Sequence, residues 1–294
     1  MNLKEYLSEK REIIDSALDH YLPPADRYPE VLHEAMRYSV MNGGKRLRPV
    51  LAIAACEAVG GDYRLALPTG CAIELIHAFS LIHDDLPALD NDDLRRGNPT
   101  NHKVYGEAMA ILAGDGLLAY AFETIAKFTK GVPAGTIVDV IGRVAAATGM
   151  SGMIVGQVVD IISEGQKIEP ETLKFMHRNK TGALITLSCV TGALLGGGTD
   201  EQIDSLRLYG EKIGLAFQIA DDILDVVGDQ EKLGKPVGSD VENNKSTYPS
   251  LYGLEKSREF AEQAVQDAVN VLKGFDDKAE PLRTIARYIV IRDS

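Results

Sequence analysis

Carboxylates and arginines are concentrated in residues 74–96, whose sequence is ELIHAFSLIHDDLPALDNDDLRR. Five aspartates fall within ten residues of this stretch, namely Asp84, Asp85, Asp90, Asp92 and Asp93. Like charges this close repel one another unless a cation compensates them. Carboxylate oxygens are ligands that suit a hard divalent cation such as Mg²⁺. The stretch therefore indicates a metal site, with a solvated acidic helix end as the alternative.

A second acidic cluster lies in the run GLAFQIADDILDVVGD, where Asp221 follows Asp84 by 137 positions. Asp221 and Asp225 are four residues apart, which on a helix is about 40° of rotation, so they share one face with Asp222 beside them. Charges among apolar neighbours are unfavourable without a partner. One aspartate could be a helix cap, but three in an apolar run favour a second metal site.

The spacing of the first cluster requires a bend. Asp90 comes six residues after Asp84, about 120° away on an ideal helix. Pro87 is expected to end the helix near Leu86 and to bring Asp90 back toward Asp84 through a short loop. Because Mg²⁺ typically bridges one or two carboxylates to phosphate oxygens, two facing aspartate clusters predict a clamp for a diphosphate.

Cationic side chains come from three motifs: MNGGKRLRP, DLRRG and RNKTGAL. Those of interest are Lys45, Arg46, Arg48, Arg95, Arg96 and Lys180. A lone Lys or Arg is usually a solvated surface charge, and GGK lacks the spacing of a P-loop. The position of the two arginines directly after the acidic cluster nevertheless predicts a second anion site that needs no metal.

His77 precedes Asp84 by seven residues, two helical turns, so it lies on nearly the same face and could donate a hydrogen bond to an anion. A purely structural role for His77 is an equally good interpretation. His83 adjoins the aspartate pair and is interpreted either as a support for those carboxylates or as a packing residue. The sequence shows no Ser/His/Asp or Cys/His arrangement and no dinucleotide fingerprint. The chemistry is therefore assigned to metals and cations.

Composition narrows the class of protein. The 294 residues are 45% hydrophobic and contain no linker-like segment, which predicts a single domain over 1–294. Three scattered cysteines are typical of reduced, buried thiols in a cytoplasmic protein. The net charge of −12 argues against nucleic-acid binding. We see no secretory signal and no apolar run near the ~20 residues of a bilayer span, so no stable membrane insertion is expected.

Apolar residues recur at three- and four-residue spacing and predict about ten helices. The clearest are 3–21, 29–41, 49–59, 66–83, 150–162 and 181–195. The β-branched runs GTIVDVIGRV and ARYIVIRD have no hairpin partner, so helix is favoured there too. The segments 150–162 and 181–195 are apolar on most sides and contain glycines, which places them inside the bundle with close neighbours. An all-α bundle with a central cavity follows.

Together these motifs resemble the trans-isoprenyl diphosphate synthases, and among them the bacterial farnesyl diphosphate synthases and their geranylgeranyl-making relatives. The matching motifs cover nearly the whole chain and are GGKRLRP, DDLPALD, DDLRRG, KTGALI, GLAFQIADDILD and LGKPVGSDVENNKSTYP. The resemblance implies the isoprenoid synthase fold, a large helical bundle around a deep central cavity, and a homodimer. It also implies head-to-tail condensation of isopentenyl diphosphate with an allylic partner, dimethylallyl or geranyl diphosphate.

The resemblance further implies roles for individual residues. Three Mg²⁺ per active site would be held by Asp84, Asp85 and Asp90 on one side and by Asp221 and Asp225 on the other. The allylic diphosphate and the reacting cation would be held by Arg95, Lys180, Thr181, Gln218 and Lys235. Isopentenyl diphosphate would be held by Gly44, Lys45, Arg48, His77 and Arg96.

Product length in this family depends on residues just before the first aspartate motif, here Phe79 and Ser80. A bulky ring five residues before Asp84 resembles the farnesyl-forming arrangement, so a fifteen-carbon product is expected, with geranylgeranyl diphosphate as the alternative. Helical geometry places Phe79 about 140° from Asp84, which leaves open that the ring only packs the core.

Two other classes of protein share part of this pattern. A terpene cyclase shares an all-α fold and an aspartate cluster, but it does not need the isopentenyl site of GGKRLRP and Arg96. A non-catalytic prenyltransferase-like subunit is expected to lose aspartates or lysines from the motifs, and the principal ones are present here. The sequence therefore predicts an active prenyltransferase.

Overall fold

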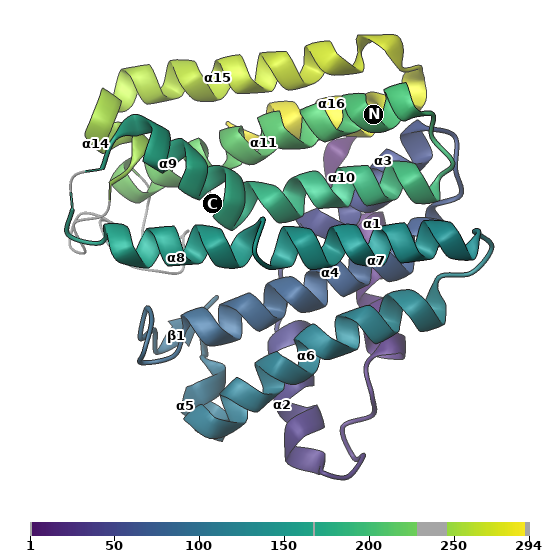
Figure 1. Cartoon of the computed structure of the whole chain (residues 1–294), viewed down its shortest axis with the longest axis vertical. Coiled ribbons are helices and arrows are strands. Elements are labelled where there is room, and N and C mark those ends of the chain that lie inside the picture. The colour runs from purple at the N-terminus through teal and green to yellow at the C-terminus, as the bar shows by residue number, and fades with distance from the viewer. Residues whose placement is uncertain (1, 167, 228–245, 292–294) are drawn as a thin grey trace.

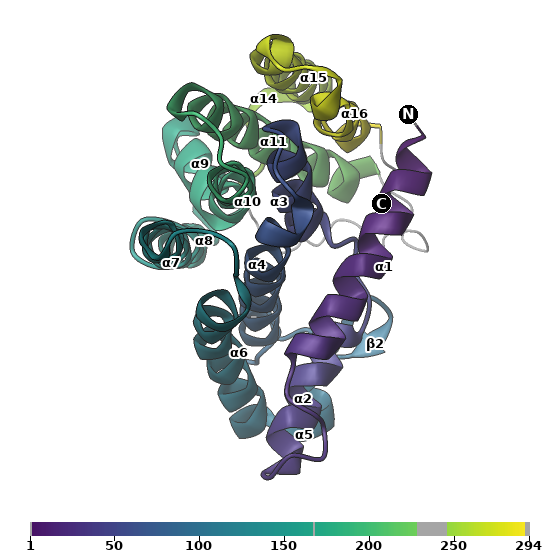
Figure 2. The same cartoon turned by 90° about the vertical axis from the view of Figure 1, so that its right-hand side faces the viewer.

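The computed structural model of the chain describes residues 2–166, 168–227 and 246–291. Most of them lie in helices that pack into one bundle, so the predicted all-α fold is confirmed (Figure 1, Figure 2). The helices are α1 (Leu3–Tyr21), α2 (Glu30–Met41), α3 (Leu47–Ala58), α4 (Tyr63–Asp84), α5 (Asn101–Tyr105), α6 (Glu107–Phe128), α7 (Ala134–Thr148), α8 (Met153–Ser163), α9 (Pro170–His177), α10 (Ala183–Leu195), α11 (Asp200–Val227), α14 (Tyr248–Tyr252), α15 (Leu254–Val271) and α16 (Glu280–Ile289).

Five short elements complete the described chain. A π-helix, η1 (Arg178–Gly182), joins α9 to α10, and two 3₁₀ turns, η2 (Leu272–Gly274) and η3 (Asp277–Ala279), precede α16. Strands β1 (Leu94–Arg95) and β2 (Asn98–Pro99) form an antiparallel hairpin. The β-branched run GTIVDVIGRV, which could have been a strand, is helical in α7, as expected. The run ARYIVIRD is helical in α16 as far as Ile289, and its last two residues lie outside the described residues.

Glycines in the core let helices pack backbone to backbone. Gly192 of α10 lies against the carbonyl of Ala52 in α3, and a Cβ at this position would sit 2.9 Å from the Ala52 carbonyl carbon. Gly210 of α11 lies against α10, where a Cβ would be 2.7 Å from Cα of Thr186. The expectation that glycines in segment 181–195 permit close approach is confirmed, and it explains how α3, α10 and α11 form one compact layer.

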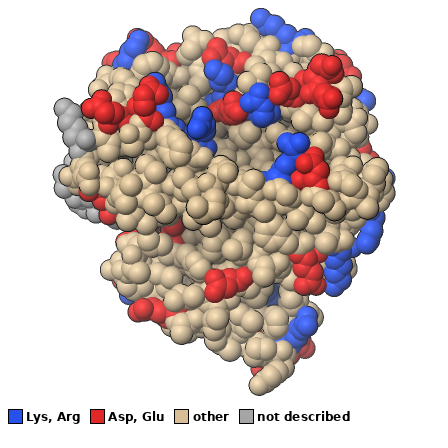
Figure 3. All heavy atoms as spheres, viewed as in Figure 1, with Lys and Arg blue, Asp and Glu red and all other residues tan. Residues whose placement is uncertain are grey.

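The predicted interior position of segment 150–162 is wrong for the single chain. The segment contains α8, but Ile154, Val158 and Ile162 on its outer side are 39%, 51% and 61% exposed. Figure 3 shows a broad band without charged side chains across the face where Figure 1 places α7 and α8. An apolar pattern on all sides shows that a helix avoids water, but it does not show whether its second cover belongs to the same chain.

Within the described residues, three helical stretches are long and apolar enough to cross a membrane, judged by length and composition alone. They are α4, α6 and the stretch Ala134–Ser163. In the 18-residue apolar segment of each, 72%, 39% and 28%, respectively, is buried inside the protein. The expectation that no run reaches this length is therefore wrong. Alanine, glycine and threonine between the larger apolar residues extend these runs, and α4 needs no membrane because the bundle itself covers most of it.

Candidate active site

The first aspartate cluster begins where α4 ends. Asp84 is the last residue of α4 and Asp85 caps it, after which Pro87 lies in a series of turns. The backbone N–H of Asp90 donates to the carbonyl of Asp84 at 2.8 Å and closes this loop. The expectation that the chain turns back and brings Asp90 toward Asp84 is confirmed.

The environment of Asp84 suits a cation. Burial raises the pKa of its carboxyl to about 6; the charges of Asp90 and Asp85 act in the same direction, and those of Lys180 and Arg95 oppose them. A buried carboxylate beside two others is unfavourable as a charged group unless a positive charge compensates it. The cluster therefore fits a divalent cation, and Lys180, from the π-helix, faces the same space.

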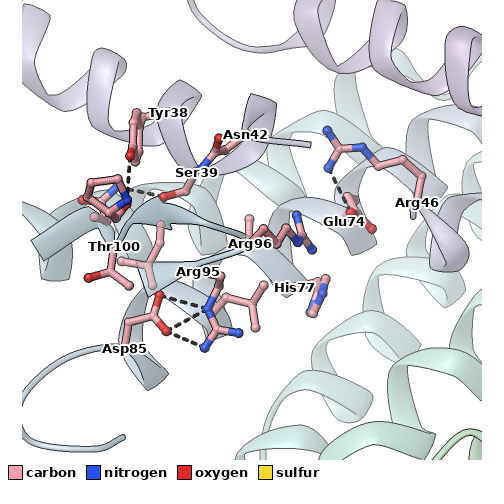
Figure 4. Close-up of a pocket in the computed structure, with 15 residues that line it drawn as sticks. Tyr38, Ser39, Asn42, Arg46, Glu74, His77, Asp85, Arg95, Arg96 and Thr100 are labelled. Carbon is pink, nitrogen blue, oxygen red and sulfur yellow. Dashed lines mark hydrogen bonds and ion pairs between the residues drawn. The ribbon is translucent and has the colours of Figure 1, made fainter. Parts of the chain in front are cut away.

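Asp85 is bound by an arginine in this structure. Its carboxylate accepts hydrogen bonds from Nε of Arg95 at 2.8 and 3.1 Å (Figure 4). Asp92 lies 3.6 Å from the same guanidinium. The predicted role of Asp85 as a metal ligand requires this ion pair to open. Among the described residues, no group of three or more His, Cys, Asp or Glu side chains converges to hold a metal ion. Further oxygen ligands would have to come from a phosphate, as Mg²⁺ sites commonly require.

A tight hairpin carries the second arginine to the GGKRLRP motif. Arg96 and Gly97 connect β1 to β2 with φ of 53° and 77°, as a two-residue turn of the twisted hairpin type requires. The guanidinium of Arg96 donates to the carbonyl of Gly43. Gly44 has a φ of 142°, which L side chains rarely adopt, so this position needs glycine. Lys45 follows and is exposed.

Behind this loop, arginines surround a neutral histidine. Arg46 is held by Asp15 at 2.7 Å and by the buried Glu74 at 3.1 Å, so it has a structural role. Burial lowers the pKa of His77 well below its ordinary value, and the charges of Arg48 and Arg96 lower it further. Figure 4 shows Arg96 and His77 between the Arg95–Asp85 and Arg46–Glu74 ion pairs.

Arg48 supplies an unsatisfied donor on the same side. Its Nε is buried and has no hydrogen-bond partner among the described residues. Burial lowers the pKa of this guanidinium, and the charge of Arg96 adds to that effect. Because a buried donor without an acceptor is unfavourable, Arg48, Arg96 and His77 together fit an anion such as a diphosphate.

The second side of the site comes from η1 and α11. The π-helix places Lys180 beside Thr181, and such widened turns occur frequently at functional sites. The Thr181 hydroxyl donates to Oε1 of Gln218 on α11 at 2.7 Å. One turn further along α11, Asp221 is half-buried and Asp225 is buried. The negative charge of Asp221 opposes the lowering of the Arg48 pKa, which indicates that the second aspartate motif lies near Arg48.

Sequence reasoning missed two carboxylates that position cations. Asp160 of α8 is buried and binds Nζ of Lys180 at 2.5 Å, and Glu74 binds Arg46 as described above. Each is an isolated charge in an otherwise apolar helical run, MIVGQVVDIIS for Asp160, and that isolation was the available signal. Lys235, predicted to bind the allylic diphosphate, lies outside the described residues.

Phe79 lies toward α6. Its ring meets that of His83 edge-on with centroids 4.8 Å apart, and Nε2 of His83 lies 3.1 Å from the carbonyl of Ile111 in α6. Gly114 of α6 makes room, because a Cβ there would overlap the His83 ring. Ser80 is half-buried, and its hydroxyl donates to the carbonyl of His77 at 3.0 Å. Ser80 is therefore the small residue one turn before Asp84, and Phe79 is a buried ring at the α4–α6 contact.

Comparison with known proteins agrees with this geometry. Residues 29–286 match the family model described as polyprenyl synthetase. The chain is 52% identical to a dimethylallyltranstransferase of Fischerella ambigua (99% of this chain, 84% of the relative) and 50% identical to a geranylgeranyl diphosphate synthase of Cyanophora paradoxa (100% and 97%). A crystal structure of an FPP/GFPP synthase from Zymomonas mobilis superposes with a TM-score of 0.88 at 40% identity, covering 98% of this chain and 99% of the other.

A second solved structure, geranylgeranyl pyrophosphate synthetase from Pyrococcus horikoshii, gives a TM-score of 0.89 at 33% identity and covers 99% of this chain and 100% of the other. Both sequence relatives and both structures therefore match essentially the full length of the chain. This protein belongs to the polyprenyl synthetase family and is a trans-prenyl diphosphate synthase.

Proposed function

We propose that the site condenses isopentenyl diphosphate head-to-tail with dimethylallyl or geranyl diphosphate and that farnesyl diphosphate is the main product. The observation that carries the choice of substrates is the division of the site into two anion-binding sides. One side combines an aspartate cluster with Lys180 and Arg95 and suits a diphosphate that leaves with a metal. The other combines Arg48, Arg96 and a neutral His77 and suits a diphosphate that stays bound.

The allylic side works through charge that develops in the transition state. As the allylic C–O bond breaks, negative charge grows on the departing diphosphate, and Lys180 and Arg95 stabilise that charge more than the ground state. Asp160 keeps Lys180 in place through their 2.5 Å ion pair. Asp84, Asp90, Asp221 and Asp225 would hold Mg²⁺, which when bound supplies further positive charge at this diphosphate.

The isopentenyl side holds the nucleophile. Lys45, Arg48 and Arg96 bind its diphosphate, and the neutral His77 donates a hydrogen bond without adding charge. The double bond of isopentenyl diphosphate then attacks the allylic cation, and the released diphosphate takes the proton that is lost. Oxygen atoms of Thr181 and Gln218 stabilise the cation, and the apolar bundle excludes the water that would quench it.

The braced ring of Phe79 supports a fifteen-carbon product. The ring is buried, and His83 fixes its position by contacting both Phe79 and the backbone of α6. A growing prenyl chain that extends from Asp84 along α4 would meet a wall that cannot easily move aside.

Geranylgeranyl diphosphate is the second candidate. Relatives named as geranylgeranyl diphosphate or pyrophosphate synthases are 50–51% identical over their alignments with this chain. The small Ser80, rather than Phe79, follows the same helical face as Asp84, so a longer chain could pass beside the ring.

Product analysis decides between the two. Purified protein is incubated with Mg²⁺, isopentenyl diphosphate and an allylic diphosphate of five, ten or fifteen carbons, and the dephosphorylated products are separated by chain length. We expect fifteen-carbon product from the two shorter primers, and no product from any pair would contradict the proposed function. Phe79→Ala should lengthen the product by at least one five-carbon unit, with Phe122→Ala on α6 as a control for loss of a ring elsewhere. Unchanged product length in Phe79→Ala would reject the wall.

We also propose that the protein is a homodimer, formed through an apolar surface of α6, α7 and α8 that we name the α6–α8 face. It consists of Ile111, Leu112, Val138, Met150, Ile154, Val158, Ile161 and Ile162, all exposed in the single chain. Large exposed apolar patches commonly mark protein–protein contacts. A membrane would have to accept Asp115 in the middle of α6 and the Arg143–Asp139 pair of α7, which is unfavourable, so a second copy is the better cover.

A further inference from the structure

Asp222 belongs to the second aspartate motif, but its carboxylate accepts hydrogen bonds from groups of the protein. The residue lies between Asp221 and Asp225 in the sequence, and its side chain is buried. Its Oδ1 accepts a hydrogen bond from Nε2 of Gln218 at 3.1 Å. Its Oδ2 accepts one from the backbone N–H of Tyr248, the first residue of α14, at 2.9 Å.

The neighbouring histidine does not change this picture. Nε2 of His177 lies 3.9 Å from Oδ2 of Asp222. Burial lowers the pKa of His177 to about 3, so the imidazole is neutral at pH 7 and the contact is not an ion pair. The ring stacks on Tyr248 with centroids 5.6 Å apart and helps to enclose the carboxylate. Gln218 and Tyr248 therefore act as donors that orient Asp222 from two different helices.

The carboxylate fixes which end of the Gln218 amide faces it. An ionised carboxylate can only accept hydrogen bonds, so it selects the NH₂ end of the amide. The carbonyl end must then point to Thr181, whose hydroxyl donates to it at 2.7 Å. This commits the Thr181 proton to Gln218 and leaves the lone pairs of the hydroxyl oxygen free. The direction of all three groups follows from the one charged acceptor at the end of the chain of hydrogen bonds.

We propose that Asp222 is a positioning residue that sets the polarity of this chain, so that Thr181 presents oxygen lone pairs rather than a proton to the allylic cation. The role rests on the proposed function, because it concerns the cation formed in that reaction. An oxygen lone pair stabilises a positive centre, whereas a hydroxyl proton turned toward it repels it. Groups that are already oriented before charge develops contribute most to such stabilisation.

Asp222→Asn tests the proposal because the new side chain has the same shape but a donor at one end. The N–H of Tyr248 still needs an acceptor, so the introduced amide turns its oxygen to Tyr248 and its NH₂ to Gln218. The Gln218 amide must then reverse and present its own NH₂ to Thr181, which can no longer donate to it. We expect kcat to fall about 10- to 100-fold, with KM for both diphosphates and the half-saturating Mg²⁺ concentration within about twofold of wild type.

A compensating exchange separates polarity from a merely structural role. In the double variant Asp222→Asn/Gln218→Glu, the carboxylate introduced at position 218 accepts from both the new amide and the Thr181 hydroxyl. This restores the original direction at Thr181 and conserves net charge, so we expect the double variant to regain at least about tenfold in kcat over Asp222→Asn. Gln218→Glu alone should be poor, because two carboxylates then face each other. Such a pattern is strongly non-additive, as coupled neighbours should be.

The outcomes are distinct. Wild-type kcat in Asp222→Asn, or no gain in the double variant, overturns the role of Asp222 while the proposed function stands. A tenfold or larger increase in half-saturating Mg²⁺ for Asp222→Asn overturns it as well, because Asp222 would then be a metal ligand. A wild-type protein without prenyltransferase activity removes both proposals. Circular dichroism checks that each variant folds, and the double variant still decides the question if Asp222→Asn alone does not.

Discussion

At the scale of single residues, the site is dominated by charges that the protein alone leaves poorly compensated. Asp84 is half-buried beside Asp85 and Asp90, and Arg48 carries a buried N–H without an acceptor among the described residues. Both features are unfavourable in the ligand-free protein, and both are relieved by the species that the site is proposed to bind. The same side chains should therefore lower stability without ligands and support activity with them.

Asp84→Asn should make the metal-free protein more stable at pH 8. The folded-state pKa of Asp84, about 6, exceeds its ordinary value of 3.8, so the folded state disfavours the charged form above pH 6. By linkage, this reduces the free energy of unfolding by about 3 kcal/mol at pH 8, and less as the pH falls toward 4, where the carboxyl is protonated. We expect Asp84→Asn to recover about 1–3 kcal/mol at pH 8, measured by denaturant unfolding with EDTA.

The matched control is Asp93→Asn. Asp93 is exposed, and its hydrogen bond with Lys103 lowers its pKa, so its removal should not stabilise the fold at any pH. Equal stability of Asp84→Asn and wild type at pH 8, or a gain that persists at pH 4, would contradict the assigned environment of Asp84. Turnover should fall by orders of magnitude in Asp84→Asn despite the gain in stability.

The sequence identified which residues carry charge at the site, but not which partner each one binds. Asp84 and Asp85 are adjacent and were predicted to act alike, yet one is left among like charges and the other is bound by Arg95. Asp222 lies in the same motif as Asp221 and binds Gln218 and Tyr248 instead. Side-chain direction depends on which donors other helices bring near, and spacing along one helix does not encode that.

At the scale of elements, the contact between α8 and η1 fixes the position of Lys180. Gly156 of α8 packs directly against the π-helix, and a Cβ there would overlap the backbone N of Lys180 and lie 2.6 Å from its Cα. Asp160, one turn later on the same helix, then binds the Lys180 side chain. One helix therefore sets both the backbone and the ammonium group of this residue.

Gly156→Ala should reduce kcat at least about tenfold, because small displacements of groups that act on the reacting centre have large effects on rate. The added methyl group would push α8 away from η1 and move Lys180 relative to Asp84. Gly135→Ala in α7 is the control, since nothing lies within 4 Å of its Cβ. There the change should be neutral or slightly stabilising, because alanine is the better helix former. Steady-state kinetics and thermal unfolding of both variants test this, and wild-type kinetics in Gly156→Ala would refute it.

Helices were predictable where local chemistry defines them. The segment 3–21 matches α1 at both ends, and at the N-terminal end Asn2 caps the helix by accepting from the backbone N–H of Lys4 at 3.1 Å. The π-helix at 178–182 was not predictable, since a wider turn leaves no distinct pattern in five residues. The break after Asp84 was, since Pro87 cannot continue a helix.

At the scale of the whole molecule, the exposed apolar surface requires an explanation that one chain does not provide. The α6–α8 face spans three helices, and all of its residues are Ile, Leu, Val or Met. The apolar pattern correctly predicted helices that avoid water, but it did not predict that these side chains are exposed in the single chain. A symmetric dimer covers the same patch on both copies, which is the commonest arrangement of soluble oligomers.

Val138→Asp should convert the proposed dimer to a monomer. Val138 is 68% exposed on α7, and in the dimer it would be buried, where an unpaired carboxylate is strongly unfavourable. Val31→Asp is the control, because Val31 is 41% exposed on α2, which Figure 2 places at the bottom of the molecule, away from α7 and α8.

Light scattering coupled to size exclusion should give twice the chain mass of 31.9 kDa for wild type and Val31→Asp, and the single mass for Val138→Asp. A monomeric wild type would reject the dimer, and a dimeric Val138→Asp would place its interface elsewhere. Flotation with lipid vesicles separates the remaining alternative, because a membrane-bound α6–α8 face would carry the wild type, but not Val138→Asp, to the vesicle fraction. Asp115 and the Arg143–Asp139 pair would have to lose water on entering lipid, so we expect both proteins to remain in the aqueous fraction.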